Sequence, residues 1–269
     1  MNVGVVLRRG AMAALVVVYG FPLYFLVATS LRPNDAITND AAAIIFEPTL
    51  ESYQVVLDSA FVSATSNSLQ IALGGTLLLL LIGVPFAYGC ARIRGRVLAL
   101  VIGALIAFQM VPATASVIPL FRVLGSVGML GSVPGLIVAD TALLLPFVVL
   151  LLRPFFRAVP IEVEEASMVE GANQFQVFRH VALPLASNGV TTVAVMTFVI
   201  LWGEFLYAVS FLNPSAYPTA ALLASQISWY GANWNRLMAL AVLTALPVII
   251  VFIFAQRRFR EGLAVGAGK

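Results

Sequence analysis

The sequence predicts an all-α polytopic membrane protein with six transmembrane helices, in a single domain that covers residues 1–269. Hydrophobic residues make up 61% of the chain and charged residues only 10%, whereas soluble domains carry about 25% charged residues. The mean hydropathy is +1.01. Several apolar segments are also long enough to cross the roughly 30 Å of hydrocarbon in a bilayer. These observations exclude an ordinary soluble domain.

The first three spans are predicted at about 11–31, 66–91 and 97–119. A secretory signal peptide is the alternative for the first, but the apolar region of such a peptide is usually only about 7–15 residues long. Three arginines follow the second span directly, and the third span contains Pro112 and Pro119 in its second half. The polar segment 32–62 between the first two spans is rich in Asp and Glu.

The other three spans are predicted at about 133–152, 189–212 and 235–256. A loop over 213–234 separates the last two of them. The fourth and fifth are separated by the longer segment 153–188, which is polar where the rest of the chain is almost continuously apolar. This segment is therefore the part of the chain best suited to contact an aqueous partner.

Basic residues predict the orientation, because the cytoplasmic loops of membrane proteins carry an excess of Lys and Arg. With a cytoplasmic N-terminus, 12 of the 15 Lys and Arg residues fall on the inner side. Both termini and segment 153–188 are therefore expected in the cytoplasm, and the acidic segment 32–62 outside. The same bias accounts for the pI near 9.3, so the positive charge does not indicate nucleic-acid binding.

Within segment 153–188, the spacing of polar and apolar residues predicts a first short helix that ends at a glycine. Pro160 suits the first turn of a helix, where its missing N–H is not needed. Acidic residues follow it at the positive end of the helix dipole. Gly171 can end the helix, because glycine adopts the left-handed conformation of a C-terminal cap. Apolar residues recur on one side of this helix, at Val163, Ala166 and Val169.

A second short helix is predicted directly after this corner. Asn173 is a favourable N-cap, and Gln176 stands three residues later in the arrangement of a capping box. Pro184 is expected to end the helix, because proline removes a donor and clashes with the preceding turn. The apolar side of this helix is formed by Phe175, Phe178 and Ala182. By periodicity alone, the helix pair would fit a surface lying flat on the membrane as well as a docking surface for a cytoplasmic partner.

The residues of this segment resemble a known loop. Glu165-Ala166-Ser167, three residues, Gly171, nine residues and then Val181-Ala182-Leu183-Pro184 is similar to the EAA loop of permease subunits in binding-protein-dependent ABC importers. The family pattern is EAA, three residues, glycine, nine residues, isoleucine, any residue and leucine-proline. Ser167 and Val181 are mild departures from it, and Asn188 stands where a later proline is frequent.

Softer matches cover most of the chain and are similar to the carbohydrate-uptake subfamily, which includes the maltose-type inner-membrane permeases. They comprise Pro112 to Pro119, Leu145-Pro146-Phe147, Phe155-Phe156, Trp202 with Glu204-Phe205, and Arg258-Phe259 with Gly262-Leu263. The resemblance implies a subunit of the bacterial cytoplasmic (inner) membrane that forms part of the path for a sugar or sugar-like solute.

The resemblance also implies partners and a cytoplasmic coupling-helix (EAA) loop between spans four and five. A second permease, usually a different chain, would complete the path, two ATPase subunits would bind ATP and Mg, and an extracytoplasmic solute-binding protein would deliver the solute. The lipid bilayer would surround the spans. The residues implied at the ATPase contact are Glu165, Ala166, Ser167, Gly171, Ala172, Leu183 and Pro184. For Glu165 a solvated charge at the start of a helix is the alternative.

The chain is not expected to be an enzyme or to hold a cofactor or metal of its own. A P-loop requires a lysine followed by Ser or Thr, and the only lysine is Lys269, the last residue. Cys90 is the only cysteine and His180 the only histidine. A thiolate metal cluster and a Ser-His-Asp triad are therefore not expected, and ATP hydrolysis is assigned to a partner.

Polar residues inside predicted spans are candidates for the solute path, because each is unfavourable in hydrocarbon. The path candidates are Gln109, Trp202, Glu204 and Tyr207, which offer hydrogen-bonding groups and aromatic faces to a sugar. Interhelical hydrogen bonds are the alternative role for each of them. For the whole chain, the other functions are an ABC permease for an amino acid, peptide or phosphate, a secondary transporter, and a membrane enzyme.

Overall fold

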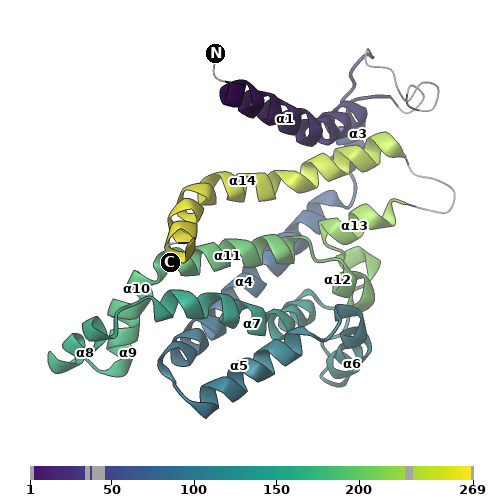
Figure 1. Ribbon diagram of the computed structural model, residues 1–269. Coiled ribbons are helices and arrows are strands. Elements are labelled where there is room, and N and C mark those ends of the chain that lie inside the picture. Colours follow the sequence, from purple (N-terminus) through teal and green to yellow (C-terminus); the bar gives the residue numbers. More distant parts are fainter. Residues whose placement is uncertain (1–2, 34–36, 38–45, 228–232, 268–269) are drawn as a thin grey trace. The chain divides into compact units, whose positions relative to one another are not determined.

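A computed structural model describes residues 3–33, 37, 46–227 and 233–267, and these residues are almost entirely helical (Figure 1). The chain divides into two compact units, one formed by residues 1–63 and 222–247 and the other by residues 64–221 and 248–269. The acidic residues Asp35 and Asp40 of the first predicted loop, and Trp229 of the last, lie outside the described residues.

The first unit contains α1 (Val3–Ser30) and α3 (Glu51–Leu57). It also holds the beginning of α4 (Phe61–Arg92) and the first part of α14 (Trp234–Ala267). Its core is small and consists of Val56, Phe61, Ala239 and Leu240. Most apolar side chains of α1 that the structure describes are exposed, as expected for a helix that faces lipid or another subunit.

The second unit contains the main hydrophobic core. After α4 come α5 (Arg96–Gln109), α6 (Ala113–Ser126) and α7 (Val133–Arg157). The largest fully buried side chains include Phe156, Ile71, Leu79, Leu136 and Leu152, from α4 and α7. Ser132 caps the start of α7 by accepting a hydrogen bond from the backbone N–H of Gly135.

The part of segment 153–188 that lies between α7 and α11 forms short helices at one end of this unit (Figure 1). They are α8 (Ile161–Val169), α9 (Gln174–Val177), a π-turn (Phe178–Ala182) and α10 (Leu183–Leu185). The chain then returns to the core as α11 (Ser187–Trp202) and α12 (Leu206–Phe211). The short helices η2 (Pro214–Ala216) and α13 (Thr219–Ser225) follow.

Four helices in the described residues are long and apolar enough to span a membrane, and two bent pairs raise the number to six if each pair is one span. The third predicted span, 97–119, is not continuous, because α5 and α6 meet at a bend of 96°. Pro112 explains the break, since the residue before a proline is pushed out of the helical conformation and proline itself cannot donate to the preceding turn. Pro119, by contrast, lies inside α6.

The fifth predicted span, 189–212, also differs from the structure. Its helix α11 ends at Trp202, and α12 begins only at Leu206. At its other end, the segment Gln174–Leu185 meets α11 at a bend of 75°. Pro184 therefore does not end the second short helix at its own position. It lies inside α10 directly after the π-turn, and the irregularity that proline imposes on the helix is taken up by the π-turn and the bend.

Candidate functional site

The predicted glycine corner is present between α8 and α9. Gly171 has a φ of 98°, which lies in the left-handed region that favours glycine. Its N–H donates to the carbonyl of Met168 at 3.0 Å, and the N–H of Ala172 donates to the carbonyl of Ser167 at 3.1 Å. This pair of bonds is a Schellman motif, which satisfies the last carbonyls of a helix and turns the chain sharply.

The predicted capping box at the start of α9 is confirmed. The N–H of Gln176 donates to Oδ1 of Asn173 at 2.9 Å, and the N–H of Asn173 donates to Oε1 of Gln176 at 2.8 Å. Both bonds are local, so the helix start does not depend on a partner for its shape. Together with the corner at Gly171, they make α8 and α9 a preformed pair.

Several large apolar side chains of this helix pair are exposed. Val169 is 89% exposed and Phe175 is 66% exposed. Large exposed apolar side chains that gather on one segment usually mark a surface that contacts another molecule. The other exposed apolar residues of α8 are Ile161, Val163 and Met168. A shallow hollow of about 430 Å³ lies at the corner, lined by Ser167, Glu170, Gly171, Ala172, Gln176, His180 and Val181.

Helix α8 is anchored to α4 by a buried ion pair between Glu164 and Arg92. Glu164 is only 2% exposed, and its carboxylate accepts hydrogen bonds from Arg92 Nε at 2.9 Å, Arg92 Nη2 at 2.5 Å and the Tyr88 hydroxyl at 3.0 Å. Arg92 Nη2 also donates to the carbonyl of Val159 at 3.2 Å. This bidentate geometry is the strong form of a guanidinium–carboxylate contact. It connects α8 to the end of α4, which is a candidate span.

Aromatic rings surround this ion pair and complete what we call the anchor cluster, formed by Tyr88, Arg92, Phe156, Glu164 and Phe178. The Tyr88 ring lies 5.7 Å from Phe156 in an edge-to-face arrangement and 5.1 Å from Phe178. The guanidinium of Arg92 lies 5.5 Å above the Tyr88 ring. The predicted apolar side of the second helix is therefore divided, because Phe178 and Ala182 face inward while Phe175 faces outward.

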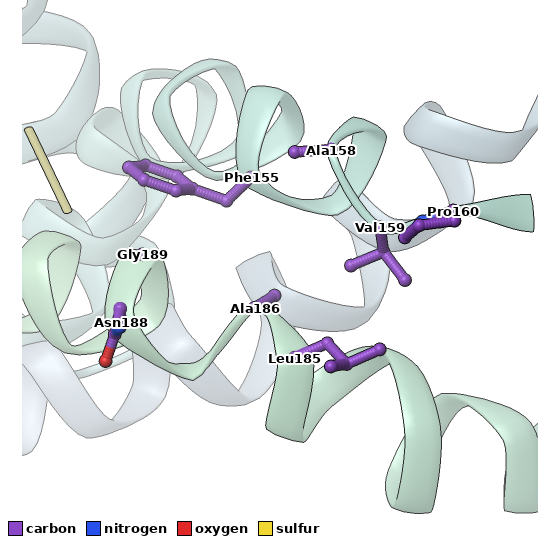
Figure 2. A pocket seen from close by; sticks show the side chains of 8 residues that line it. All are labelled: Phe155, Ala158, Val159, Pro160, Leu185, Ala186, Asn188 and Gly189. Atoms are coloured by element: carbon purple, nitrogen blue, oxygen red, sulfur yellow. The ribbon is translucent and has the colours of Figure 1, made fainter. Parts of the chain in front are cut away.

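The two ends of segment 153–188 meet at a small cavity of about 200 Å³ between the end of α7 and the start of α11 (Figure 2). Phe155 and Val159 line it from one side, and Leu185 and Gly189 from the other. A Cβ atom at Gly189 would lie 2.1 Å from Cγ of Phe155, so only glycine permits this approach of α11 to α7. The end of α7, where the loop begins, and the start of α11, where it ends, are thus packed against each other.

A second, larger cavity of about 710 Å³ lies where the two interrupted spans face α7. Met110, Val111 and Pro112 line it from the break between α5 and α6, and Glu204 lines it from the break between α11 and α12. Irregular backbone at membrane depth is tolerated where it lines a cavity rather than lipid, and interrupted helices at such positions form binding sites in many transporters. The cavity volume is within the range of small-molecule sites.

Polar groups face this cavity from four helices or their ends. The Tyr207 hydroxyl donates to the carbonyl of Ala113 at 3.1 Å and lies 2.8 Å from Oγ of Ser116. The Glu204 carboxylate accepts the backbone N–H of Tyr207 at 2.7 Å. Asp140 is 2% exposed, and its Oδ2 has no hydrogen-bond partner among the described residues. An unpartnered buried carboxyl oxygen is costly, so Asp140 is a candidate for hydrogen bonding to a molecule in the cavity.

The predicted site residues thus fall into groups. Ser167, Gly171 and Ala172 line the hollow, and Glu165 and Ala166 are exposed on the neighbouring turn of α8. Leu183 packs against the core and Pro184 is exposed, and neither lines the hollow.

Among the path candidates, Gln109, Glu204 and Tyr207 line the large cavity. Trp202 does not, since it is 3% exposed and stacks on Phe198 at 5.9 Å. The sequence reasoning missed Arg92 and Glu164. The adjacent carboxyls of Glu164 and Glu165 were a signal, because neighbouring residues on a helix point in different directions, so that only one of them can face the spans.

Known proteins share both the sequence and the fold of this chain. The family described as "Binding-protein-dependent transport system inner membrane component" matches residues 80–265. The trehalose transport system permease protein SugB of Mycobacterium tuberculosis is 32% identical over 260 residues, which are 95% of this chain and 94% of that protein. The diacetylchitobiose uptake system permease protein DasC of Streptomyces coelicolor is 32% identical over 254 residues, covering 93% of this chain and 91% of that one.

A solved structure supports the same fold. It is a bacterial ABC transporter involved in the import of the acidic polysaccharide alginate, and the match has a TM-score of 0.81 at 22% identity, covering 95% of this chain and 96% of that chain. The fold is therefore that of a membrane-spanning ABC transporter subunit. The chain belongs to the family of binding-protein-dependent transport system inner membrane components, which confirms the resemblance recognised in the loop motif.

Proposed function

We propose that this chain is one of two membrane-spanning subunits of an ATP-driven sugar importer, and that its α8–α9 corner docks on an ATPase subunit. The observation that carries this proposal is the group of exposed apolar side chains on α8 and α9 beside the left-handed corner at Gly171. A preformed helix pair of this kind can insert apolar side chains into a groove of a partner without first becoming ordered. Glu165, Ala166, Ser167 and Ala172 would contribute to the same contact.

The anchor cluster explains how such a contact would move the membrane part. Force must pass from the ATPase to the spans through side chains, since the two subunits share no backbone. The Glu164–Arg92 pair joins α8 directly to α4, and Leu183 joins the other arm to the core. With this arrangement, a displacement of the corner would move the ends of α4, α7 and α11 together.

We assign six spans, formed by the four long apolar helices, by α5 together with α6, and by α11 together with α12. Both termini and the α8–α9 corner are assigned to the cytoplasm. The excess of basic residues at the corresponding ends supports this orientation. ATP and Mg would be bound by two ATPase subunits, and a second permease would close the path. The family description names a binding-protein-dependent system, which supports an extracytoplasmic solute-binding protein as the donor of the solute.

The large cavity is the proposed solute path of this subunit. Gln109, Glu204 and Tyr207 line it together with Ser116 and Asp140. Hydroxyl, amide and carboxyl groups of this kind can exchange hydrogen bonds with the hydroxyls of a sugar. The relatives named for trehalose and diacetylchitobiose uptake support a carbohydrate as the solute.

Docking of the corner is tested by cross-linking in the complete transporter. A single cysteine at Val169, introduced by Val169→Cys in a Cys90→Ala background, is expected to label the ATPase subunit when it carries a photoactivated cross-linker. The residue is 89% exposed on the proposed contact. The matched control is Val123→Cys on α6, where the native valine is 56% exposed on an element outside segment 153–188. Labelling from position 123 but not from position 169 contradicts the docking proposal.

The cavity is tested by removing its carboxylates. Asp140→Asn and Glu204→Gln are each expected to lower the uptake rate about tenfold at saturating solute-binding protein, because a buried hydrogen-bonding group left without its partner costs about 1–3 kcal/mol. The ATPase subunits should remain bound, since neither residue belongs to the loop. The control is Trp202→Phe, which alters a packed ring outside the cavity. Normal uptake by both carboxyl variants would show that the solute passes elsewhere.

A further inference from the structure

Four arginines line a cavity of about 510 Å³ that is separate from the hollow at Gly171 and from the proposed solute path. Arg92 and Arg94 reach it from the end of α4 and the turn that follows, and Arg153 and Arg157 reach it from the end of α7. The turn is closed by Gly95, whose φ of 82° is in the left-handed region. We call this cavity the arginine pocket.

The positive charge of the arginine pocket is only partly compensated by acidic residues. The ion pair recorded among the described residues joins Arg92 to Glu164. Arg153 donates through Nε to the carbonyl of Cys90 at 3.1 Å, which orients its guanidinium and leaves its charge in place. Glu162 is the acidic residue in the lining. Arg94 and Arg157 are exposed, and each brings a full positive charge to the same space.

The pocket lies at the ends of candidate membrane helices, where the boundary between hydrocarbon and water is expected. Candidate membrane helices α4 and α7 end there, and α5 begins there. Apolar side chains at and beside the pocket are exposed. Ile93, which lines the pocket, is 44% exposed, and Val97 and Leu100 on α5 are 59% and 73% exposed. A ligand in the pocket can therefore place a charged group among the arginines and an apolar chain along α5.

We propose that the arginine pocket binds the phosphate headgroup of an anionic phospholipid from the leaflet on the side of the α8–α9 corner. Guanidinium groups bind phosphate oxygens in pairs of parallel hydrogen bonds, and basic pockets between membrane helices on the cytoplasmic side are suited to acidic headgroups. An inorganic phosphate shares this headgroup chemistry. The exposed apolar side chains of α5 favour a phospholipid over inorganic phosphate, because only the lipid has an acyl chain that can contact them.

The bound headgroup would act on coupling through Arg92, which belongs both to the pocket and to the anchor cluster. A phosphate between the α4–α5 turn and the end of α7 would hold together the two elements that carry α8. This consequence, and the choice of leaflet, rest on the proposed function. The binding itself does not, because it is measured without ATP or solute.

The test is native mass spectrometry of the complete transporter, with both permeases and the ATPase subunits, purified from nanodiscs of phosphatidylcholine containing phosphatidylglycerol. Wild type is expected to retain phosphatidylglycerol. Arg94→Gln and Arg157→Gln should each weaken retention about fivefold, and the double variant about thirtyfold, since each basic residue near a membrane surface contributes to anionic-lipid binding by roughly that factor. The matched control is Arg96→Gln, which removes an exposed arginine two positions from Arg94 that does not line the pocket.

Each outcome decides the proposal. Unchanged retention in the double variant overturns it, and an equal loss in Arg96→Gln assigns the effect to general surface charge instead of the pocket. Displacement of the lipid by millimolar inorganic phosphate assigns the pocket to a soluble anion. Loss of the ATPase subunits from the double variant shows that carboxylates of that partner occupy the arginines. If wild type retains the lipid but shows no ATP-driven uptake, lipid binding by the arginine pocket is supported and the proposed function is overturned.

Discussion

Replacing Gly171 by Asp is expected to abolish uptake while the permease stays in the membrane. The φ of 98° at this position lies in the left-handed region, where an L side chain costs about 1–2 kcal/mol. A Cβ built there meets no described atom of the chain within 4 Å, so the new carboxylate would project from the corner toward the proposed ATPase contact. It would also add negative charge at the negative end of the α8 dipole.

Two further variants distinguish an effect on the backbone conformation of the corner from an effect on its contact with the ATPase. Gly171→Asn has nearly the same shape without the charge, and asparagine tolerates the left-handed conformation better than most residues, so partial uptake is expected. Gly171→Val places a β-branched side chain where its φ is a genuine outlier, so the corner itself should open. Uptake and solute-stimulated ATP hydrolysis are measured in proteoliposomes. Wild-type values for Gly171→Asp in both assays would refute a coupling role for the corner.

This corner could be predicted from the sequence because every interaction that shapes it is local. The Schellman bonds at Gly171 and the capping box of Asn173 and Gln176 join residues at most five positions apart. Residue types and spacing carry such information directly. The presence of several long apolar segments is likewise a local property of the sequence. The break of the third span at Pro112 was within reach of the same reasoning, since both effects of a proline are local.

The anchor cluster and the cavity depend on tertiary packing and were out of reach. Arg92 and Glu164 are 72 residues apart, and only the packing of α8 against the end of α4 brings them together. The same holds for Asp140, which the sequence shows as one polar residue in an apolar helix. Its candidate role in the solute path is recognised only from the cavity that it lines together with Glu204. Trp202 illustrates the converse, because a promising residue type can point into the core.

The largest loss of stability is expected from Arg92→Ala, which leaves the carboxylate of Glu164 buried without its cation. Breaking a buried pair by removing one partner costs about 3–5 kcal/mol, because an uncompensated charge remains. Glu164→Ala should cost less, since the Arg92 side chain is 20% exposed and can recover water, whereas the Glu164 side chain is 3% exposed. Thermal unfolding of the purified complex measures both. Arg96→Ala, which removes an exposed arginine near the same end of α4, should be close to neutral.

The double variant Arg92→Ala/Glu164→Ala distinguishes an ion pair from two independent packing losses. If the two side chains act together, the double variant should be more stable than Arg92→Ala alone, because the orphaned carboxylate is gone. Coupling should remain impaired in it, since α8 has lost its direct bond to α4 while the exposed face of the corner is intact. ATP hydrolysis by the bound ATPase subunits with little solute uptake is therefore expected. Additive destabilisation together with normal transport per ATP would mean that the pair neither holds the loop nor transmits its movement.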